Sequence, residues 1–285
     1  KNYIMKTKIL IKVDSSIGYI PTLEGVCSAF SSVNDGIYIW DAKKPTYDVF
    51  YECQPEILIC MDKTIDSSLS NVLQEYKDTK VIAIGPEVPD YFEPDLTCYP
   101  GASGEKLYDL QPAANLIDYA PSPAKDKYKS EISTISDNES PVINSLSSFS
   151  LKSFSYTRKL RYPNYVGKIL PNEIPSIFSS CNLYLDTDGH NDLLLSAMAN
   201  SCPCLSANET VLSVDYMPKA ASLEELTACI KAIVLKKSFR EEHVEKCYQF
   251  VMEKHTYFHR ASDMLSLLGY KEYSKSCLNK LEEYV

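Results

Sequence analysis

Glycine is scarce in this chain, with 9 glycines among 285 residues. Loops that wrap their backbone around phosphates are commonly glycine-rich, so the low count gives little sign of such a loop. No stretch approaches the ~18 consecutive apolar residues that a membrane span needs. No signal peptide is visible, because the first residues lead directly into the apolar run Lys8–Val13. We therefore expect a globular protein with no membrane span.

The chain also lacks the cysteine spacing of a metal site, although it contains 10 cysteines. No C-x-x-C pair occurs, and Cys202-Pro203-Cys204 has the wrong spacing for a zinc knuckle. Other cysteines lie inside apolar runs, as Cys60 does. We expect buried thiols in a reducing compartment, the cytoplasm, and no bound metal. His255 and His259 have helical metal-pair spacing, but we interpret that segment as a cap that packs over the domain interface.

Charge is distributed unevenly along the chain. The net charge is −9; residues 1–120 hold 10 basic and 18 acidic side chains, and residues 121–285 hold 19 and 20. An acidic half repels nucleic acid phosphates, so we expect no nucleic acid partner. The acidic half would suit a neutral or cationic ligand, and the alternative is a solvated acidic surface.

Strand-like and helix-like runs alternate along the chain, which predicts α/β domains built on parallel sheets. The stretch 86–123 is rich in proline and turn residues, and we interpret it as the end of the first domain and the crossing to the second. The domains are expected at residues 1–120 and 121–285, with the final helices able to pack back on the first domain. In the first domain we expect strands at 8–13, 36–40, 56–61 and 81–84 and helices at 22–31 and 67–76.

The second half shows the same alternation. Residues 137–150 are rich in serine and predict a loop, or a helix only around 142–146. Ser222 followed by Glu225 forms a capping box at the start of a helix. We expect strands at 129–135, 151–156, 165–167, 183–185 and 203–205 and helices at 171–179, 193–200, 222–235, 239–253, 258–268 and 271–284.

A series of motifs in the second half carries a resemblance to a known family. The first motifs are a strand ending in glycine at Tyr165–Gly167, a strand before an asparagine-containing loop at Leu183–Thr187, and a small-residue helix within Asn191–Leu205. A capped helix at Ser222–Leu226 and the sequence HTYFHRA at His255–Ala261 follow. This order resembles the C-terminal domain of the CgeB-like glycosyltransferases. The resemblance covers residues 165–268 and extends to the first half only at the level of fold class.

The resemblance implies the GT-B fold, an α/β architecture in which two Rossmann-like parallel-sheet domains face a cleft. It further implies a glycosyltransferase of the hexosyl type. A nucleotide-sugar donor would bind the C-terminal domain as co-substrate, and a glycan or protein acceptor would bind the N-terminal domain. No metal or other cofactor is implied.

Three positions depart from the family's pattern. The glutamate with which the family binds the donor ribose corresponds to Ser196, its arginine to Asp192 and its helix glycine to Ser201. Serine is too short to hold two ribose hydroxyls as a carboxylate does. An acid near a helix N-terminus competes with a phosphate for the helix dipole. Ser196 nevertheless marks the position at which the family binds its donor.

Polar residues follow the strand at 183–185. The carboxyl end of a parallel strand is where open α/β sheets bind ligands, so Asp188 and His190 are candidate catalytic residues there. Related retaining enzymes carry the first acid of a two-glutamate motif at the position of Asp188. Asn191 is a candidate ligand for sugar hydroxyls. The alternative is that Asp186–Asn191 is simply a turn that caps a helix.

Two further regions supply candidates. Arg161 and Lys168, beside Gly167, belong to a run of basic residues that could neutralise a donor diphosphate; the alternative is a solvated strand face. Asp14 opens the loop after the first strand. Because that loop faces the cleft in GT-B enzymes, the resemblance makes Asp14 a candidate catalytic base or acceptor ligand.

Two functions therefore stay open. The first is a glycosyltransferase, favoured by the His190-Asn191 loop and by HTYFHRA. The second is a catalytically degenerate GT-B protein with a binding or structural role, as an oligomer or in a larger assembly. Ser196, Asp192, Ser201 and the scarcity of glycine favour the second.

Overall fold

The chain forms two compact units, seen in a computed structural model. The first, unit 1, comprises Lys1–Pro112 and Tyr257–Val285, and the second, unit 2, comprises Ala113–Thr256. The structure describes residues 8–13, 21–33, 36–41, 43–189, 191–207 and 222–284. The boundary after Pro112 lies earlier than the expected one after residue 120, and the chain enters unit 1 again at Tyr257.

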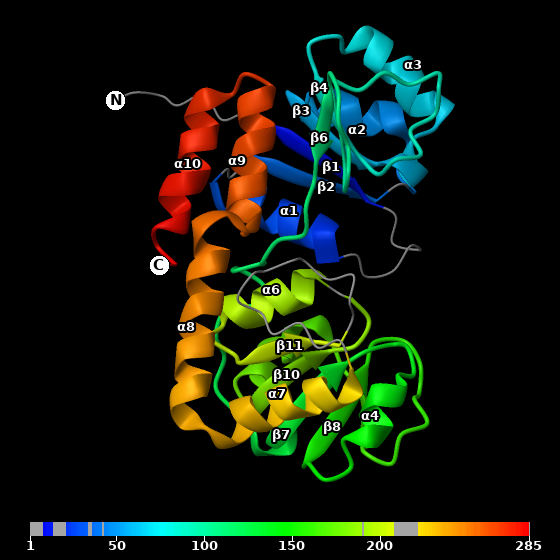
Figure 1. Cartoon of the computed structure of the whole chain (residues 1–285). Coiled ribbons are helices and arrows are strands. Elements are labelled where there is room, and N and C mark those ends of the chain that lie inside the picture. The colour runs from blue at the N-terminus through cyan, green and yellow to red at the C-terminus, as the bar shows by residue number, and fades with distance from the viewer. Residues whose placement is uncertain are drawn as a thin grey trace. The chain divides into compact units, whose positions relative to one another are not determined.

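Unit 1 is built on a six-stranded sheet in the order β2-β1-β3-β4-β5-β6. All neighbouring strands are parallel. The strands are β1 (Ile9–Val13), β2 (Ile37–Asp41), β3 (Ile57–Met61), β4 (Lys80–Ile84), β5 (Leu96–Tyr99) and β6 (Leu107–Asp109). The helices are α1 (Pro21–Val33), α2 (Thr46–Cys53), α3 (Ser67–Glu75), α9 (Tyr257–Leu267) and α10 (Lys271–Leu281), with a short 3-10 turn at Asp62–Thr64 (Figure 1).

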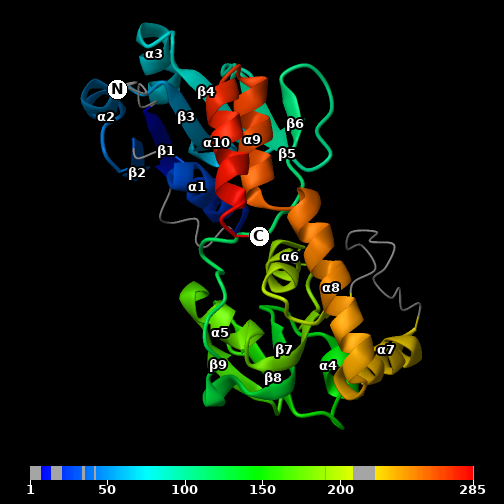
Figure 2. The same cartoon turned by 90° about the vertical axis from the view of Figure 1, so that its left-hand side faces the viewer.

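The central strands of unit 1 are apolar along their whole length because helices cover both faces of the sheet. Leu10 and Leu58 pack with Phe50 of α2 and with Leu69 of α3 in one buried cluster. On the other face, α1 packs against α9 and α10 (Figure 2). The four strands expected in this half are confirmed within one or two residues at each end. Burial on both sides explains this for β1, β3 and β4, whereas β2 is an edge strand with Tyr38 and Ile39 exposed.

Residues 86–123 contain two strands that the sequence did not predict, because β5 and β6 lie within this stretch and extend the sheet of unit 1. Both strands are short and lie among prolines and turn residues, so their apolar pattern is weak in the sequence. Helix α2 was also not predicted. It occupies only Thr46–Cys53, too short for a clear helical period.

The last two helices of the chain complete unit 1. At the contact between α1 and α9, Gly25 lies against the ring of Tyr257. A Cβ atom added at Gly25 would lie 2.1 Å from Tyr257 Cδ2. The absence of a side chain at Gly25 therefore allows the two helices to approach closely.

Unit 2 is built on a five-stranded parallel sheet in the order β11-β10-β7-β8-β9. The strands are β7 (Ser130–Ile135), β8 (Leu151–Ser155), β9 (Tyr165–Lys168), β10 (Cys181–Asp186) and β11 (Cys204–Ser206). The helices are α4 (Pro141–Ser145), α5 (Ile174–Phe178), α6 (Asn191–Ala199), α7 (Leu223–Leu235) and α8 (Lys237–Lys254), with 3-10 turns at Asp126–Tyr128 and Pro171–Glu173. These elements confirm the strands and helices expected in this half, apart from small shifts at their ends.

Two helix ends in unit 2 follow the sequence closely. Ser222 caps α7, and its side chain accepts a hydrogen bond from the backbone N–H of Glu225 at 3.2 Å. After α6 the chain turns through Ser201, whose φ is +53°. That left-handed conformation favours glycine, the residue that the family carries at this position.

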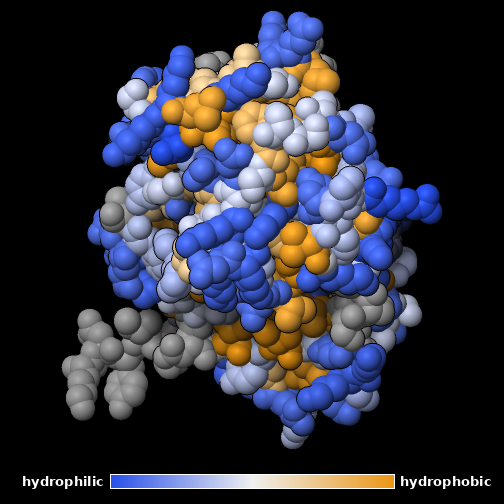
Figure 3. Space-filling model, turned by 90° about the horizontal axis from the view of Figure 1, so that it is seen from below, coloured by the Kyte–Doolittle hydropathy of each residue, from blue (hydrophilic) through white to orange (hydrophobic). Residues whose placement is uncertain are grey.

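The described part of the chain shows no helix that is both long and apolar enough to cross a membrane. Figure 3 shows hydrophobic residues gathered in patches among polar ones on one face of the surface. In the described part of unit 2, the large hydrophobic side chains that are exposed are Val166, Leu170, Leu223, Leu235 and Phe239.

Candidate functional site

The unit 2 sheet has a reversal of strand order at its carboxyl edge. The chain starts in the middle of the sheet at β7, proceeds outward through β8 to β9, and then returns to the other side of β7 as β10. The direction of strand order therefore reverses between β7 and β10. In open α/β sheets, ligands bind in the crevice outside the carboxyl ends of the strands at such a reversal.

Asp188 lies at this reversal, directly after β10. Its Oδ1 accepts a hydrogen bond from Ser136 Oγ at 2.7 Å, and its Oδ2 accepts one from Asn138 Nδ2 at 3.3 Å. Ser136 and Asn138 follow β7, so the Asp188 carboxylate joins the two loops that border the crevice. The sheet thus places Asp188 where the sequence predicted it, and its neighbours fix the orientation of its side chain.

Asp186, at the end of β10, builds the turn beneath Asp188. Its carboxylate is fully buried and accepts hydrogen bonds from the backbone N–H of Gly189 at 3.1 Å and from Ser206 Oγ at 2.9 Å. Gly189 has a φ of +75°, which glycine adopts without strain. Asp186 is therefore the side chain that caps the turn, whereas the side chain of Asp188 points toward the loop after β7.

Of the two residues after this turn, only Asn191 is described by the structure. His190 lies outside the described residues. Asn191 begins α6, and its Oδ1 is buried without a hydrogen-bond partner among the described residues. A buried amide oxygen of this kind can accept a hydrogen bond from a hydroxyl group.

Three polar side chains form a row that we call the α6 stripe: Asp192 and Ser196 on α6 and Asn200 directly after its last residue. They are four residues apart and therefore share one face of the helix. Each one bonds the backbone of the segment that follows Pro112. Asp192 Oδ1 accepts from Ala113 N at 3.0 Å, Ser196 Oγ accepts from Asn115 N at 3.1 Å, and Asn200 Nδ2 donates to the carbonyl of Tyr119 at 2.6 Å.

The α6 stripe includes two of the positions at which the chain departs from the family. Ser196 is fully buried, and its hydroxyl also donates to the carbonyl of Asp192 at 2.7 Å. The position of Ser196 is therefore packed against residues 113–119 of the same unit. A ligand reaching Ser196 would have to displace backbone hydrogen bonds.

The basic candidates lie toward the other end of the sheet. Lys168 is exposed at the end of β9, and Gly167 beside it has a φ of +154° with open space around it. Since β9 and β10 are three strand spacings apart, their backbones are separated by roughly 14 Å. Arg161 is exposed in the loop before β9, and its backbone N–H donates to Glu139 Oε1 at 3.0 Å. Arg161 thus lies nearer to the loop after β7 than Lys168 does.

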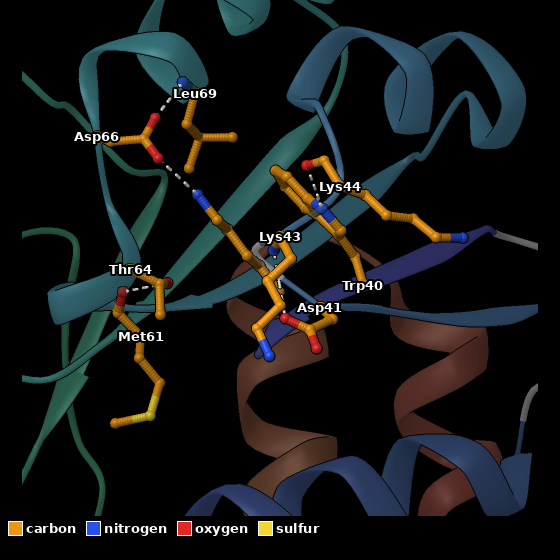
Figure 4. A network of polar contacts seen from close by, with 9 residues as sticks. Trp40, Asp41, Lys43, Lys44, Met61, Thr64, Asp66 and Leu69 are labelled. Atoms are coloured by element: carbon orange, nitrogen blue, oxygen red, sulfur yellow. Dashed lines mark hydrogen bonds and ion pairs between the residues drawn. The ribbon is translucent and has the colours of Figure 1, made fainter. Parts of the chain in front are cut away.

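Asp14 lies outside the described residues, but the strand before it contains an unpredicted feature. Lys12 in β1 is 1% exposed. Its Nζ lies 3.0 Å from Asp66 Oδ2 and 4.6 Å from the centroid of the Trp40 ring (Figure 4). The strand order of unit 1 reverses between β1 and β3, so Lys12 lies near the switch point of the first sheet.

The HTYFHRA segment is divided between the two units. His255 ends α8 in unit 2, where its ring stacks on Phe250 at a centroid distance of 4.1 Å. His259 belongs to α9 in unit 1, so the two histidines do not share one helix. Arg260, also in α9, donates from Nε to the carbonyl of Gln111 at 3.0 Å and from Nη2 to that of Pro112 at 3.2 Å. The segment therefore packs on a ring in unit 2 through His255 and holds backbone in unit 1 through Arg260.

No family model matches the chain, and no curated protein matches it. Solved structures do. UDP-GlcNAc 2-epimerase from Neisseria meningitidis, bound to UDP-GlcNAc, has a TM-score of 0.52 at 11% identity, over 97% of this chain and 100% of that chain. The glycosyltransferase of kitacinnamycin has a TM-score of 0.50 at 8% identity, over 92% and 99%. The N-terminal domain of Candida albicans trehalose-6-phosphate phosphatase has a TM-score of 0.51 at 10% identity, over 95% and 98%.

These likenesses show the GT-B fold, which the two parallel-sheet units match. The three proteins are named for an epimerase, a transferase and a phosphatase. Because one fold carries such different chemistry, the function of this chain has to be argued from its own residues.

Proposed function

We propose that the chain binds a nucleotide-activated sugar at the carboxyl edge of the unit 2 sheet and transfers the sugar to a glycan or protein acceptor. The observation that carries the proposal is the position of Asp188 at the switch point between β7 and β10, with its carboxylate held by Ser136 and Asn138. The GT-B fold supports the proposal as an analogy.

The proposed reaction is a displacement at the anomeric carbon of the donor sugar. The acceptor hydroxyl forms a bond to that carbon, the bond to the nucleoside diphosphate breaks, and a carboxylate base takes the hydroxyl proton. Asp188 and Asp14 are the proposed carboxylates, with His190 as a further candidate. Asn191, through its unpartnered Oδ1, would accept a hydrogen bond from a sugar hydroxyl.

The proposed reaction also requires positive charge to neutralise the diphosphate of the donor. Arg161 and Lys168 are exposed cations in the loop before β9 and at the end of β9, and Gly167 leaves open space beside them. Their side chains are the proposed counter-charges. The reaction as proposed uses the nucleotide sugar as co-substrate, with no metal in the transfer step.

Membership of the CgeB-like family is likewise a proposal. It rests on HTYFHRA, in which Arg260 bonds two backbone carbonyls and Tyr257 packs on Gly25. The nine-residue helix α6 keeps the place of the family's small-residue helix. A cytoplasmic location is proposed because the described structure holds all 10 cysteines as free thiols.

The experiment that tests the proposal is a thermal-shift panel of UDP-, GDP- and other nucleotide sugars. A donor at about 100 times its dissociation constant adds about 2.7 kcal/mol to the free energy of unfolding. Where a donor shifts the melting temperature, Asp188→Asn should reduce turnover with that donor. Asp126→Asn, which changes an exposed acid paired with Lys129, is the matched control and should leave turnover unchanged. No shift with any donor would contradict the proposal.

A second function is favoured by the α6 stripe. Asp192, Ser196 and Asn200 bond residues 113–119, so the face that holds the donor in the family is occupied by the chain itself. We propose as the alternative a degenerate GT-B protein with a binding or structural role in an oligomer or larger assembly. This alternative predicts that no nucleotide sugar shifts the melting temperature. It also predicts a native mass, measured by light scattering, above that of one 32.1 kDa chain.

A further inference from the structure

Three side chains with metal-binding atoms converge in the core of unit 2: Cys204, His243 and Cys247. One nitrogen or sulfur atom from each lies within 4.8 Å of those of the other two. Cys247 Sγ is 3.6 Å from His243 Nε2. The three residues are 0%, 6% and 1% exposed, respectively. The described residues contain no other group of three such ligands that meets this distance.

The fold explains how residues distant in sequence meet here. His243 and Cys247 are four residues apart in α8, so they point from the same face of that helix. Cys204 begins β11, which pairs with β10. His243 Nε2 lies 2.8 Å from the carbonyl oxygen of Cys204, a contact that holds α8 against the start of β11.

The separations fit a tetrahedral zinc ion. With Zn–S bonds of about 2.3 Å and Zn–N bonds of about 2.0–2.1 Å, a tetrahedral angle places sulfur and nitrogen about 3.6 Å apart. The separation of Cys247 Sγ and His243 Nε2 has this value. Two thiols and an imidazole are also the donor types that select zinc among the divalent metals of the cell.

We propose that Cys204, His243 and Cys247 bind a structural zinc ion that fixes α8 to the sheet of unit 2. A tetrahedral site takes four ligands, and three of them would be Cys204, His243 and Cys247. The neighbouring thiol of Cys202 is not within 4.8 Å of all three and instead contacts Cys181, with their sulfur atoms 3.8 Å apart.

A surface hollow of about 450 Å³ lies near the cluster. It is lined by residues of the β10 start, the turn before β11 and α8, among them Cys181, Pro203 and Val244. Pro203 and Val244 are next in sequence to Cys204 and His243, but none of the three proposed ligands lines the hollow. Glu241, Glu245 and Arg240 also line it, so acidic and basic side chains both face this hollow.

A metal-free explanation of the same contacts makes a different prediction. Buried thiols pack as small apolar side chains, and a proton on His243 Nε2 can be donated to the carbonyl of Cys204. Zinc requires that nitrogen without its proton, so the metal and this hydrogen bond exclude each other at Nε2. Metal binding by the native chain separates the two explanations.

The test uses the full chain, purified in a reductant that does not bind metal. We expect about one zinc ion per chain by mass spectrometry. After removal of the zinc, Co²⁺ should produce thiolate charge-transfer absorption and the visible bands of tetrahedral cobalt, and Zn²⁺ should remove both. A folded wild-type chain that gives no such absorption with Co²⁺ would overturn the proposal.

Variants assign the ligands. Cys204→Ser and Cys247→Ser should each weaken Co²⁺ binding by about tenfold or more and reduce the charge-transfer absorption, with folding checked by circular dichroism. Cys60→Ser is the matched control, because Cys60 is a fully buried thiol in unit 1. It should bind cobalt as the wild type does. Absorption that survives in both ligand variants, or that is lost equally in Cys60→Ser, would also overturn the assignment.

Discussion

Ser196 Oγ lies 3.1 Å from the backbone nitrogen of Asn115 and accepts its hydrogen bond, while donating its own proton to the carbonyl of Asp192. The hydroxyl is thus fully used at a buried position. Serine at this place is a good fit to the segment that packs against α6, and a longer acid would collide with that segment. The departure from the family's glutamate and the path of residues 113–119 are two parts of one arrangement.

Ser196→Ala should destabilise the chain by about 1–3 kcal/mol, because it leaves the buried N–H of Asn115 without an acceptor. Ser196→Glu, which restores the family's residue type, should destabilise it further by burying a charge. Urea unfolding measures both changes. Ser68→Ala, at an exposed helical position in α3, is the control and should stay within about 0.5 kcal/mol of the wild type. Equal effects at Ser68 and Ser196 would contradict the role of the α6 stripe.

Ser201→Gly should stabilise the chain. Ser201 has a φ of +53°, a conformation that costs an L-residue roughly 1–2 kcal/mol and glycine much less. Glycine also gives the unfolded chain more freedom, so the expected net gain is about 0.5–1 kcal/mol. The control is Ser179→Gly, at a right-handed position after α5, where the change should bring no gain. Thermal unfolding of both variants decides the matter; a gain at Ser179 alone would exclude backbone strain as the cause.

Lys12 should tolerate methionine better than alanine. Lys12→Met keeps the length of the side chain beside Trp40, and the carboxylate of Asp66 stays half-exposed and hydrated. Removing one partner of an ion pair is costly when the other charge is left buried and unpaired, and Asp66 avoids this cost because its side chain is 55% exposed. Lys12→Ala opens a cavity and should cost about 2–5 kcal/mol. Should the two variants have the same urea midpoint, the ion pair rather than packing would dominate at Lys12.

Gly85→Ala should be among the costly small changes in unit 1. A Cβ atom at Gly85 would lie 2.1 Å from Asp62 Oδ2, and the φ of +122° disfavours any side chain. Asp62 cannot easily give way, because its carboxylate accepts hydrogen bonds from the N–H groups of Lys63 at 2.6 Å and Glu87 at 2.9 Å. Gly101→Ala provides the comparison, since that glycine also has a positive φ but open space. Unfolding at equilibrium should rank Gly85→Ala as clearly the less stable variant.

Glu173 links the stability of unit 2 to pH. The Lys127 ammonium, 2.8 Å from Glu173 Oε1, and the Tyr128 hydroxyl lower the pKa of the carboxyl to about 2 from 4.5. A lowered pKa means that the stabilisation is complete above the unfolded value of about 4.5 and is lost as the pH falls toward 2. The wild type should therefore exceed Glu173→Gln in stability at pH 7, and the difference should shrink between pH 4.5 and 2. A difference independent of pH would show that the charge of Glu173 is not its cause.

The sequence predicted the sheets well where the strands are apolar throughout. Burial on both faces makes runs such as Ile57–Met61 visible without any partner. β5 and β6 were not predicted, because both are short strands beside prolines. They become recognisable only through pairing, β5 with β4 and β6 with β5. The division between the units could not be read either, since it depends on where α9 and α10 pack.

The candidate site was predictable in part. The sequence predicted polar residues at the carboxyl end of a parallel strand, and Asp188 lies directly after β10; its catalytic role stays a prediction. The α6 stripe has a signal in the sequence, a polar residue at every fourth position of an otherwise apolar helix, but its partner at 113–119 is too far away to be recognised. The group Cys204, His243 and Cys247 could not be predicted for the same reason. His243 and Cys247 have helical spacing, whereas Cys204 is brought to them only by the packing of α8 on β11.

The return of α9 and α10 to unit 1 has a consequence for how the protein is made. Unit 2 is one continuous stretch and can fold as soon as it leaves the ribosome, but unit 1 needs residues from both ends of the chain. Until Tyr257 emerges, the face of α1 that carries Gly25 has no partner. The surface of α1 that packs on α9 and α10 is therefore uncovered until those helices are made, a condition in which nascent chains recruit chaperones or aggregate.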